Sequence, residues 1–494
     1  MTEQARQAAL ANSPTWSDVE GAKITVVGLG KSGVSAANAL ARRGAQVLAV
    51  DDLPEHKLAD SLNKLHPRVE VQVGQPDGPV GRRGDIFVIS PGVAPHSRRF
   101  RDIHSLSHAV MSEVELFYRL DRALNHGAGH PIAAISGTDG KTTTTLWTAH
   151  LLKKAGINAV VGGNIGDPLC DFVDTLEPND VVVAEVSAFQ LLTCSLFRPR
   201  TAVVTNIAHD HLDYFSGDLA KYVQTKCKVA DNMGPGDTLL INGDDAELEL
   251  QRAHLRGGVP FAWQLFTTQG VPDRGFGFDG ADLWLSFAAD QRIKIIAQSE
   301  LGRHGKQPIG GIHNVENALG AVGMAMALGA PLDAIRQGLQ DFSLPSHRIE
   351  FVGSIGNVRF IDDSKATNPH AAMAGLTSVA RADGEKLVWI GGGSDKESDF
   401  SELAGVVAQR ASAAILIGQT AGQIQTALGE SVAVHRCERL EEAVALGLQI
   451  AAPAGVVLLS PACASFDMFK SYAHRGDVFA TAVARLQAAV AQVK

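Results

Sequence analysis

The sequence predicts an α/β protein of three domains, each built on a mostly parallel sheet with flanking helices. The chain has 494 residues, and because a domain usually contains about 150 residues, this length suggests three of them. Short runs rich in β-branched residues recur along the chain. Each run is followed by a turn rich in Gly or Asp and then by a helical pattern, which is typical of βαβ units. These runs fall into three groups.

The expected strands are these. The first group contains Lys23–Val27, Val47–Val50 and Ile86–Ile89. The second group contains Ile132–Ile135, Val181–Val186 and Ala202–Ile207. The third group contains Val358–Ile361, Leu387–Ile390, Ala414–Ile417 and Val456–Leu459. The segment between Gly257 and Lys306, which has mixed polarity and many Gly residues, is expected to form small strands or loops.

The breaks between these groups divide the chain. They lie near Leu124–Pro131 and near Ser343–His347, and they predict domains at residues 1–126, 127–344 and 345–494. Polar and Gly residues follow the expected strands in all three groups. Ligands of open α/β sheets bind at the carboxyl ends of the strands, so each domain is expected to bind one.

Composition excludes several classes of protein. The net charge of −9 and the lack of a long basic run argue against a nucleic-acid partner. Five scattered cysteines without a CxxC pair predict free thiols in a reducing compartment. No apolar signal-peptide core is visible in Met1–Trp16. The long uncharged stretch Ala443–Phe466 is interrupted by Pro and Gly, so it predicts helix, turn and buried strand, not a membrane span. We expect a cytoplasmic protein without membrane insertion.

A phosphate-binding loop is predicted after the strand that begins at Ile132. The loop and the start of the next helix read Gly137, Thr138, Asp139, Gly140, Lys141, Thr142 and Thr143. Backbone N–H groups and the dipole at a helix start favour a phosphate. Lys141 would reach the β- and γ-phosphate oxygens, and Thr142 would ligate Mg²⁺. The general P-loop pattern is not met, because Ile135 occupies its first Gly position. A plain glycine turn with a solvated lysine is the alternative.

Two further segments carry candidate metal ligands. Glu185 ends an apolar strand, where a carboxylate is costly unless it meets a cation. Mg²⁺ prefers hard oxygen ligands, so Glu185 is a candidate, with a structural ion pair as the alternative. His211 lies in a His- and Asp-containing loop at another strand end. From the residues alone, His211 is either a metal ligand or a turn residue.

The loop Gly137–Thr142 resembles the G-T-[ND]-G-K-T loop of the Mur ligases, the ATP-dependent amino-acid ligases of peptidoglycan precursor assembly. The resemblance extends over nearly the whole chain. It implies a Rossmann-like N-terminal domain for a UDP substrate, a P-loop-like central ATPase domain and a Rossmann-like C-terminal domain for an amino acid. It also implies ATP and two Mg²⁺ ions as cofactors, a monomer, and a role in cell-wall biogenesis, cell shape and cell division.

The resemblance assigns a second metal site in the central domain. It implies that His211 contacts a second Mg²⁺. Lys226, fifteen residues further on, resembles the family's carbamylated lysine. A neutral lysine amine that captures CO₂ becomes a carbamate, whose oxygens suit a hard cation. Spacing alone would make Lys226 a surface lysine on an amphipathic helix.

Further ATP contacts are implied near the last predicted boundary. Asn314 and Asn317 match the family's G-x-H-N-x-x-N pattern, whose Asn residues bind adenine and ribose; helix capping is the alternative for Asn314. Arg348 matches the Arg of H-R-x-E, which meets ATP phosphates across the domain junction. Asp363 would bind the ribose hydroxyls and Lys365 would face the reaction centre, whereas a helix-capping turn is the alternative for the Asp-Asp-Ser sequence.

The third domain most resembles the D-glutamate-adding branch of the family. Thr367, Lys396 and Ser465 match positions that bind the glutamate carboxylates, and Phe466 and Tyr472 match their neighbours. The resemblance therefore implies ATP-dependent addition of D-glutamate to UDP-N-acetylmuramoyl-L-alanine through an acyl phosphate. Cys463, in the same segment, is interpreted as buried packing.

The first domain contains Gly28-x-Gly30-x-x-Gly33 followed by Asp51, which fits a dinucleotide fingerprint. Alone, this pattern predicts NAD, whereas the family uses the domain for UDP. Its contacts with the UDP substrate, including some from the central domain, are expected at Gly30, Lys31, Ser32, Asp52, Ser90, Gly92, Asn164, Ser187 and His211. The D-glutamate branch often has Thr-Arg after the Asp that ends this strand. In the present chain that Asp is Asp51, and Asp52-Leu53 follows it.

Three alternative functions remain from the sequence. One is another ATP-dependent ligase, either a different Mur ligase or a folylpolyglutamate synthase. The second is an NAD-dependent oxidoreductase that uses the Gly28–Gly33 loop, although nothing downstream resembles a hydride-transfer site. The third is a non-catalytic nucleotide-binding module, against which Lys141, Glu185, His211 and Lys226 argue together.

Overall fold

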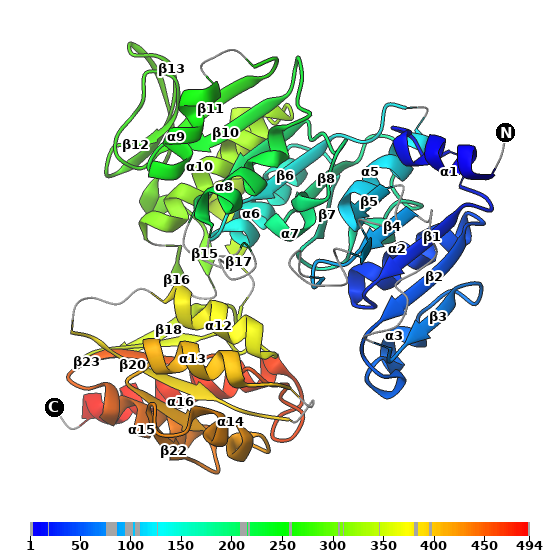
Figure 1. The fold of residues 1–494 in the computed structure, drawn as a ribbon. Coiled ribbons are helices and arrows are strands. Elements are labelled where there is room, and N and C mark those ends of the chain that lie inside the picture. Colours follow the sequence, from blue (N-terminus) through cyan, green and yellow to red (C-terminus); the bar gives the residue numbers. More distant parts are fainter. Residues whose placement is uncertain are drawn as a thin grey trace. The chain divides into compact units, whose positions relative to one another are not determined.

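The computed structural model divides the chain into two compact units (Figure 1). The first contains Met1–Leu301 and Gly310–Phe342, and the second contains Gly302–Ile309 and Ser343–Lys494. The structure describes residues 3–492 except 18, 76–85, 94–101, 104–108, 126, 208–214, 216–217, 256–258, 305–306, 310, 345, 380–383 and 395–397.

The first sheet of the first unit is entirely parallel, with the strand order β3-β2-β1-β4-β5. Its strands are β1 (Lys23–Val27), β2 (Gln46–Asp51), β3 (Glu70–Val73), β4 (Ile86–Ile89) and β5 (Ala109–Ser112). Its helices are α1 (Glu3–Asn12), α2 (Lys31–Arg42), η1 (Glu55–Lys57), α3 (Ala59–Leu62) and α5 (Glu113–Leu124). All three strands expected in the first group are present. Because Val27 is in register with Val50 and with Ile89, the turns after β1, β2 and β4 lie side by side.

The second sheet has nine strands in the order β14-β13-β12-β11-β10-β9-β6-β8-β7. Its first half contains β6 (Ile132–Ser136), β7 (Ala159–Gly163), β8 (Val181–Glu185), β9 (Thr201–Val204) and β10 (Thr238–Asn242). Its second half contains β11 (Ala262–Thr267), β12 (Gly275–Phe278), β13 (Asp282–Ala288) and β14 (Gln291–Ala297). Pairing is parallel from β7 to β12 and antiparallel from β12 to β14. Strands therefore form most of the segment expected to hold small strands or loops.

Helices pack around this sheet. They are α6 (Lys141–Lys154), η2 (Leu169–Asp171), α7 (Ala188–Leu192), α8 (Leu219–Cys227), η3 (Lys228–Ala230), α9 (Ala246–Leu255), η4 (Gln298–Glu300), α10 (Ile312–Ala327) and α11 (Leu332–Asp341). Within the sheet, Ile135 is in register with Glu185, and Ser136 is in register with Val204. These registers bring the carboxyl ends of β6, β8 and β9 together at one edge.

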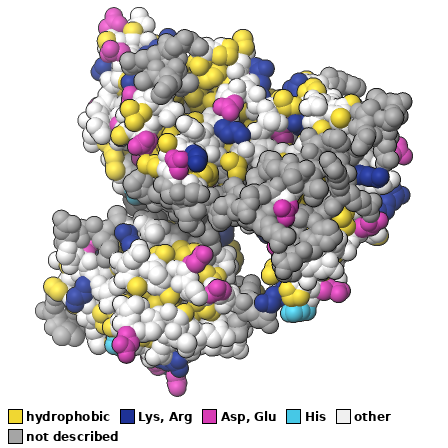
Figure 2. All heavy atoms as spheres, viewed as in Figure 1, with side chains coloured by type: hydrophobic (Ala, Val, Ile, Leu, Met, Phe, Trp, Pro, Cys, Tyr) yellow, Lys and Arg dark blue, Asp and Glu magenta, His cyan; other side chains and the backbone are white. Residues whose placement is uncertain are grey.

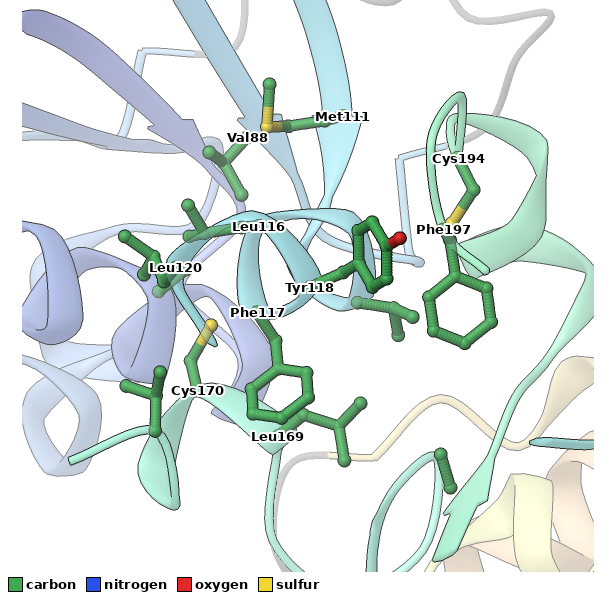
Figure 3. Packing of buried hydrophobic residues seen from close by; sticks show 14 of the residues in the cluster. Val88, Met111, Leu116, Phe117, Tyr118, Leu120, Leu169, Cys170, Cys194 and Phe197 are labelled. Carbon is green, nitrogen blue, oxygen red and sulfur yellow. The ribbon is translucent and has the colours of Figure 1, made fainter. Parts of the chain in front are cut away.

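One hydrophobic core joins the two sheets of the first unit. It contains Ile24 of β1, Leu116 of α5 and Val182 of β8. Figure 3 shows α5 in this core, with Tyr118 facing Phe197, and the two ring centroids are 5.9 Å apart at 72°. The first two groups of strands therefore share a continuous apolar interior.

A buried carboxylate joins α5 to the segment after α7. Glu115 accepts hydrogen bonds from the backbone N–H groups of Leu196 and Phe197, at 3.0 and 2.8 Å, and pairs with Arg119 at 2.9 Å. A fully paired buried charge of this kind is costly to separate. The contact therefore strengthens the connection between the two sheets.

The second unit contains a six-stranded sheet in the order β18-β19-β23-β20-β21-β22, in which only β18 is antiparallel. Its strands are β18 (Glu350–Ile355), β19 (Asn357–Asp362), β20 (Lys386–Gly391), β21 (Ala413–Leu416), β22 (Ala433–Arg436) and β23 (Ala454–Leu459). Its helices are α12 (Pro369–Ser378), α13 (Ser401–Arg410), α14 (Ala421–Leu428), α15 (Leu440–Ala451) and α16 (Tyr472–Gln492). A small separate sheet contains β15 (Arg303–His304), β16 (Gln307–Pro308) and β17 (Ser343–Leu344).

Two hydrophobic clusters pack on this sheet. One includes Leu376 of α12 and Leu403 of α13, and the other includes Val444 of α15 and Phe479 of α16. The four strands expected in the third group are present, and α15 followed by β23 confirms the interpretation of Ala443–Phe466.

The surface charge, the length of the helices and the state of the cysteines can be compared with the expectations from composition. On the face seen in Figure 2, basic and acidic side chains of the described residues intermingle. Within the described part of the chain, no helix has the length and apolar character needed to cross a bilayer. The five cysteines are free thiols.

Candidate functional site

The loop after β6 has a shape that requires glycine at two positions. Gly137 has φ +130°, and a Cβ atom there would lie 2.0 Å from Thr205 Oγ1. Gly140, the N-cap of α6, has φ +76°, and a Cβ atom there would lie 2.1 Å from Asn317 Oδ1. Only glycine tolerates both the backbone angle and the close approach. The loop therefore leads into the N-terminus of a 14-residue helix, where backbone N–H groups favour an anion.

The end of β9 holds this loop in place. Asn206 Oδ1 accepts a 2.8 Å hydrogen bond from Asp139 N, and Asn206 O accepts one of 2.9 Å from Thr138 N. Thr205 Oγ1 donates to Asp139 O at 2.6 Å. These contacts explain why β9 ends at Val204, whereas the sequence predicted a strand that continues to Ile207. That prediction of the strand end was wrong, because Thr205 and Asn206 turn toward the loop.

Lys141 lies across the loop that it follows. Its Nζ donates a 2.5 Å hydrogen bond to Thr138 O, so the ammonium group is held at the mouth of the turn. Thr143, in the same first turn of α6, is partly buried. The ammonium group is placed to neutralise a phosphate bound by the loop.

Glu185 and Thr142 form the oxygen pair expected of a metal site. Thr142 Oγ1 donates to Glu185 Oε2 at 2.7 Å, and Asn164 Nδ2 donates to Glu185 Oε1 at 2.9 Å. Glu185 is 3% exposed. Among the described residues, its carboxylate oxygens accept from a hydroxyl and an amide and not from a cationic side chain, which argues against the alternative of a structural ion pair. A carboxylate and a hydroxyl at this distance suit Mg²⁺, which takes hard oxygen ligands.

Lys226 is buried, not exposed on a helix surface. Its Nζ donates a 2.5 Å hydrogen bond to Gly137 O and lies 4.4 Å from the centroid of the Tyr222 ring. The Tyr222 hydroxyl lies 3.2 Å from Thr138 Oγ1, within hydrogen-bond distance. The alternative of a surface lysine is therefore wrong, because α8 directs this side chain against the phosphate loop. His211 lies outside the described residues.

The first turns of α10 contact the same loop. Asn317 is buried, and its Oδ1 accepts a 3.2 Å hydrogen bond from Thr144 Oγ1, while Asn314 is partly exposed. Sequence reasoning missed Glu316 between them. Burial raises the pKa of Glu316 to about 7, and the amides of Asn206 and Asn242 contact its carboxyl group. Glu316 therefore supports Asn206, which holds the phosphate loop.

Hydrogen bonds from neighbouring strand ends hold the glycine-rich turn after β1 in place. Asp51 Oδ2 accepts a 2.6 Å hydrogen bond from Leu29 N, and Ser90 Oγ donates to Gly28 O at 2.8 Å. A Cβ atom on Gly33 would lie 1.8 Å from Gly28 O. The Asp51 carboxylate, which a dinucleotide fingerprint would use for a ribose hydroxyl, is thus already bonded to the turn.

Lys31 connects this turn to the central sheet. Its Nζ lies 3.4 Å from Gly166 O, in the loop that also carries Asn164. Because Asn164 binds Glu185, the expected UDP-substrate residues and the expected metal site adjoin within the first unit. Gly30, Asp52 and Gly92 are exposed, Ser32 is partly buried, and Ser187 caps α7 through a reciprocal pair with Gln190.

In the second unit, Arg348 lies in an unusual turn. Its neighbours His347 and Ile349 have φ angles of +67° and +48°, which non-glycine residues rarely adopt. His347 Nδ1 contacts Asp362 Oδ2 at 2.7 Å, and its backbone N–H donates to Glu350 Oε2 at 2.8 Å. These three side chains are also close enough to hold a metal ion. Their mutual hydrogen bonds instead indicate a network that stabilises the turn.

Asp363 and Lys365 follow β19. Asp363 is buried, and burial raises the pKa of its carboxyl group to about 7, while Ser460 Oγ donates to its Oδ2 at 2.6 Å. Desolvation and the charge of Arg348 lower the pKa of Lys365. Burial is the main cause, and the effect of Arg348 shows that these two cationic side chains lie close enough to repel each other.

The residues expected to bind the amino acid lie at the ends of adjacent strands. Thr367 follows β19 and Ser465 follows β23, and these strands are neighbours in register from Asn357 to Asp362. Phe466 is 72% exposed and Tyr472 is 39% exposed. Cys463 is 4% exposed, which confirms its interpretation as buried packing. Lys396 lies outside the described residues.

Comparison with known proteins agrees with this architecture. Three family models match consecutive parts of the chain: Mur ligase MurD-like, N-terminal domain at residues 22–112; Mur ligase middle domain at 135–325; and Mur ligase, glutamate ligase domain at 347–463. Together with the phosphate loop, they define a three-domain ligase that uses ATP.

Curated relatives match nearly the full length. The UDP-N-acetylmuramoylalanine–D-glutamate ligase of Pelotomaculum thermopropionicum is 39% identical, over 94% of this chain and 98% of the relative. The proteins of the same name from Trichlorobacter lovleyi and Chromobacterium violaceum are each 38% identical, over 94% of this chain and 99% and 98% of the relatives. The chain belongs to the Mur ligase family.

Proposed function

We propose that this chain adds D-glutamate to UDP-N-acetylmuramoyl-L-alanine, with hydrolysis of ATP to ADP and phosphate. The main support is the full-length similarity to relatives that carry the name of this activity. The Thr142–Glu185 oxygen pair beside the phosphate loop supports the ATP-dependent step. Residues 1–126 bind the UDP substrate, 127–344 bind ATP and 345–494 bind the amino acid.

ATP binds at the loop Gly137–Gly140, with Lys141 at its phosphates. Thr142 and Glu185 would hold Mg²⁺, which would supply positive charge at the phosphate oxygens. Asn314 and Asn317 contact the adenosine, and the resemblance to the family assigns Arg348 to the phosphates and Asp363 to the ribose.

The reaction proceeds in two steps. The L-alanyl carboxylate attacks the γ-phosphorus of ATP, so that an acyl phosphate forms and ADP leaves. The amine of D-glutamate then attacks the acyl carbon, loses a proton, and expels inorganic phosphate as the amide bond forms. Lys141 and Lys365 stabilise the oxygen charge that develops on the transferred phosphoryl group. No covalent intermediate with a protein side chain is required.

We further propose that Lys226 is carbamylated and, with His211, holds a second Mg²⁺. A lysine must be neutral to react with CO₂, and a buried amine loses its proton more readily than an exposed one. Lys226 is 3% exposed and contacts the phosphate loop, so a carbamate there would add an anion close to the first ion.

The acceptor is held by hydroxyl and ammonium groups. Thr367 and Ser465 donate to the carboxylates of D-glutamate, and Lys396 supplies positive charge, while Phe466 and Tyr472 flank the site. The protein acts as a cytoplasmic monomer and needs neither nucleic acid nor membrane insertion.

A substitution on α6 tests the ATP-dependent step. Lys141→Ala should abolish the release of ADP that depends on D-glutamate, because the phosphates lose their cation. Lys153→Ala, on the exposed surface of the same helix, is the control and should keep wild-type turnover. Retention of the full wild-type rate by Lys141→Ala would refute the assignment of this loop.

A further inference from the structure

Arg475 is a fully buried arginine that the sequence analysis did not single out. It lies in the first turns of α16, and its side chain is 0% exposed. Burial lowers the pKa of its guanidinium to about 10. Asp467 and Asp362 attract this charge through space, but among the described residues neither forms a salt bridge or a hydrogen bond with it. A buried arginine without an acidic partner is unusual, because charged groups are rarely buried unpaired.

Oxygen atoms of two loops surround the guanidinium instead. Nε donates to Ser364 Oγ and Nη2 donates to Ser364 O, both at 3.0 Å. Nη2 also donates to Cys463 O at 3.0 Å, and Nη1 donates to Ala464 O at 3.3 Å. Ser364 follows β19, whereas Cys463 and Ala464 follow β23, so one side chain joins the carboxyl ends of two neighbouring strands.

A third loop is tied to the same point. Ser394, which follows β20, donates its backbone N–H to Ala464 O at 2.8 Å. A Cβ atom on Gly393 would lie 2.2 Å from Ala464 O and 3.2 Å from Arg475 Nη1. β20 is the other neighbour of β23 in the sheet. The loops at the ends of three adjacent strands therefore meet at or next to Arg475.

These loops carry Thr367 and Ser465, which are expected to recognise the acceptor amino acid, and Lys365, which is expected to face the reaction centre. Lys365 directly follows Ser364, and Ser465 directly follows Ala464. Thr367 is three residues beyond Ser364 in the same loop. A shift of either loop would move these side chains without changing any of them.

We propose that Arg475 is a positioning residue that holds the loops of Thr367 and Ser465 in the arrangement that binds a dicarboxylate amino acid at the acceptor site. This inference rests on the proposed function. The planar guanidinium is suited to the role because it donates to four oxygens in fixed directions, whereas a lysine ammonium group has only three N–H donors for the same four oxygens.

The test compares Arg475→Lys with Arg410→Lys in the full-length enzyme. Arg410, at the end of α13, also donates to backbone oxygens, those of Leu376, Thr377 and Val379, but it contacts none of the three strand-end loops. The measurements are the KM for D-glutamate, the KM for ATP, kcat and the melting temperature. Both variants keep a positive charge, so the comparison isolates the geometry of the hydrogen bonds.

Arg475→Lys should raise the KM for D-glutamate at least about tenfold, the effect expected when hydrogen bonds to a charged group are lost. The KM for ATP should rise less than the KM for D-glutamate, although Asp363 directly precedes Ser364, and Arg410→Lys should leave both constants unchanged. An unchanged KM for D-glutamate in a folded Arg475→Lys protein would overturn the inference, as would an equal rise in both constants. If the wild-type enzyme does not use D-glutamate, the proposed function itself is wrong. This result is distinguishable from a failure of the Arg475 inference, which appears only in the variant.

Discussion

The hydroxyl group of Thr142 donates a 2.7 Å hydrogen bond to the carboxylate of Glu185, although the two residues are 43 positions apart. Thr142 lies in the first turn of α6, and Glu185 ends the adjacent strand β8. The pairing of Ile135 with Glu185 brings them together. The parallel sheet thus joins the helix start proposed to bind phosphate to a buried carboxylate, and this arrangement suits an Mg²⁺-dependent phosphoryl transfer.

Removal of the Thr142 hydroxyl should weaken the use of Mg²⁺. Thr142→Val keeps the shape of the side chain but deletes the oxygen, so the concentration of Mg²⁺ needed for half-maximal turnover should rise at least about tenfold. Thr142→Ser keeps the hydroxyl and should stay near the wild-type value. The titration is followed by phosphate release. Equal Mg²⁺ dependence in the Val and Ser variants would exclude a role for this oxygen.

A methyl group at Gly140 should disrupt ATP binding. Gly140→Ala places Cβ 2.1 Å from Asn317 Oδ1, so the Asn317 side chain, α10 or the loop must shift. Gly156 has the same φ angle of +76° at the other end of α6, but a Cβ atom there meets nothing within 4 Å. Both substitutions cost about 1 kcal/mol of backbone strain. ATP affinity, measured by calorimetry, should fall only in Gly140→Ala; a similar loss in Gly156→Ala would show that strain alone is responsible.

The local sequence pattern was sufficient to predict the strands and turns that carry the proposed ATP and Mg²⁺ site. Gly137, Gly140 and Lys141 were recognisable because a strand, a glycine turn and a helix follow one another directly. Glu185 stood out as one charge at the end of an apolar run. All ten expected strands exist. β9 ends at Val204, before the predicted end at Ile207, because Asn206 binds the phosphate loop and does not continue the strand.

Contacts between distant residues could not be read from the sequence. Lys226 resembles a surface lysine until the fold brings it to Gly137, 89 residues away. Arg475 is linked to Ser364 across 111 residues, and no local pattern distinguishes it from an exposed helix residue. The continuous core of the first unit was also missed, because the packing of α5 depends on Phe197 and other residues far along the chain.

Carbamylation of Lys226 should be directly observable. Addition of ¹³C-labelled bicarbonate to the wild-type protein should produce a carbamate carbon signal in the NMR spectrum. Lys226→Arg cannot form a carbamate, because its guanidinium stays protonated, and it should lack both the signal and turnover. The same carbamate signal in Lys226→Arg would assign the modification elsewhere.

Stability should depend on pH through Glu113. This side chain lies at the start of α5, where Oε1 accepts a 2.6 Å hydrogen bond from Cys170 N and Oε2 has no partner. Burial raises the pKa of Glu113 to about 7. Between about pH 4.5 and 7 the unfolded chain therefore loses this proton while the folded protein keeps it, so the free energy of unfolding falls as the pH rises.

Glu113→Gln removes this ionisation while it keeps the shape of the protonated acid. The variant should be more stable than the wild type at pH 8 by up to about 3 kcal/mol, and the difference should vanish near pH 4. Amide hydrogen exchange of α5 in both proteins at pH 4 and pH 8 measures this difference in stability. A stability difference that does not vary with pH would show that Glu113 is not the titrating group.

The most direct test of the account is phosphate release from ATP in the presence of UDP-N-acetylmuramoyl-L-alanine and one amino acid at a time. The panel contains D-glutamate, L-glutamate, D-alanine, L-alanine, glycine and L-lysine, together with a reaction that contains no amino acid. We expect sustained release only with D-glutamate, together with an equal amount of the amide product. Faster release with another amino acid, or no release with any of them, would contradict the account.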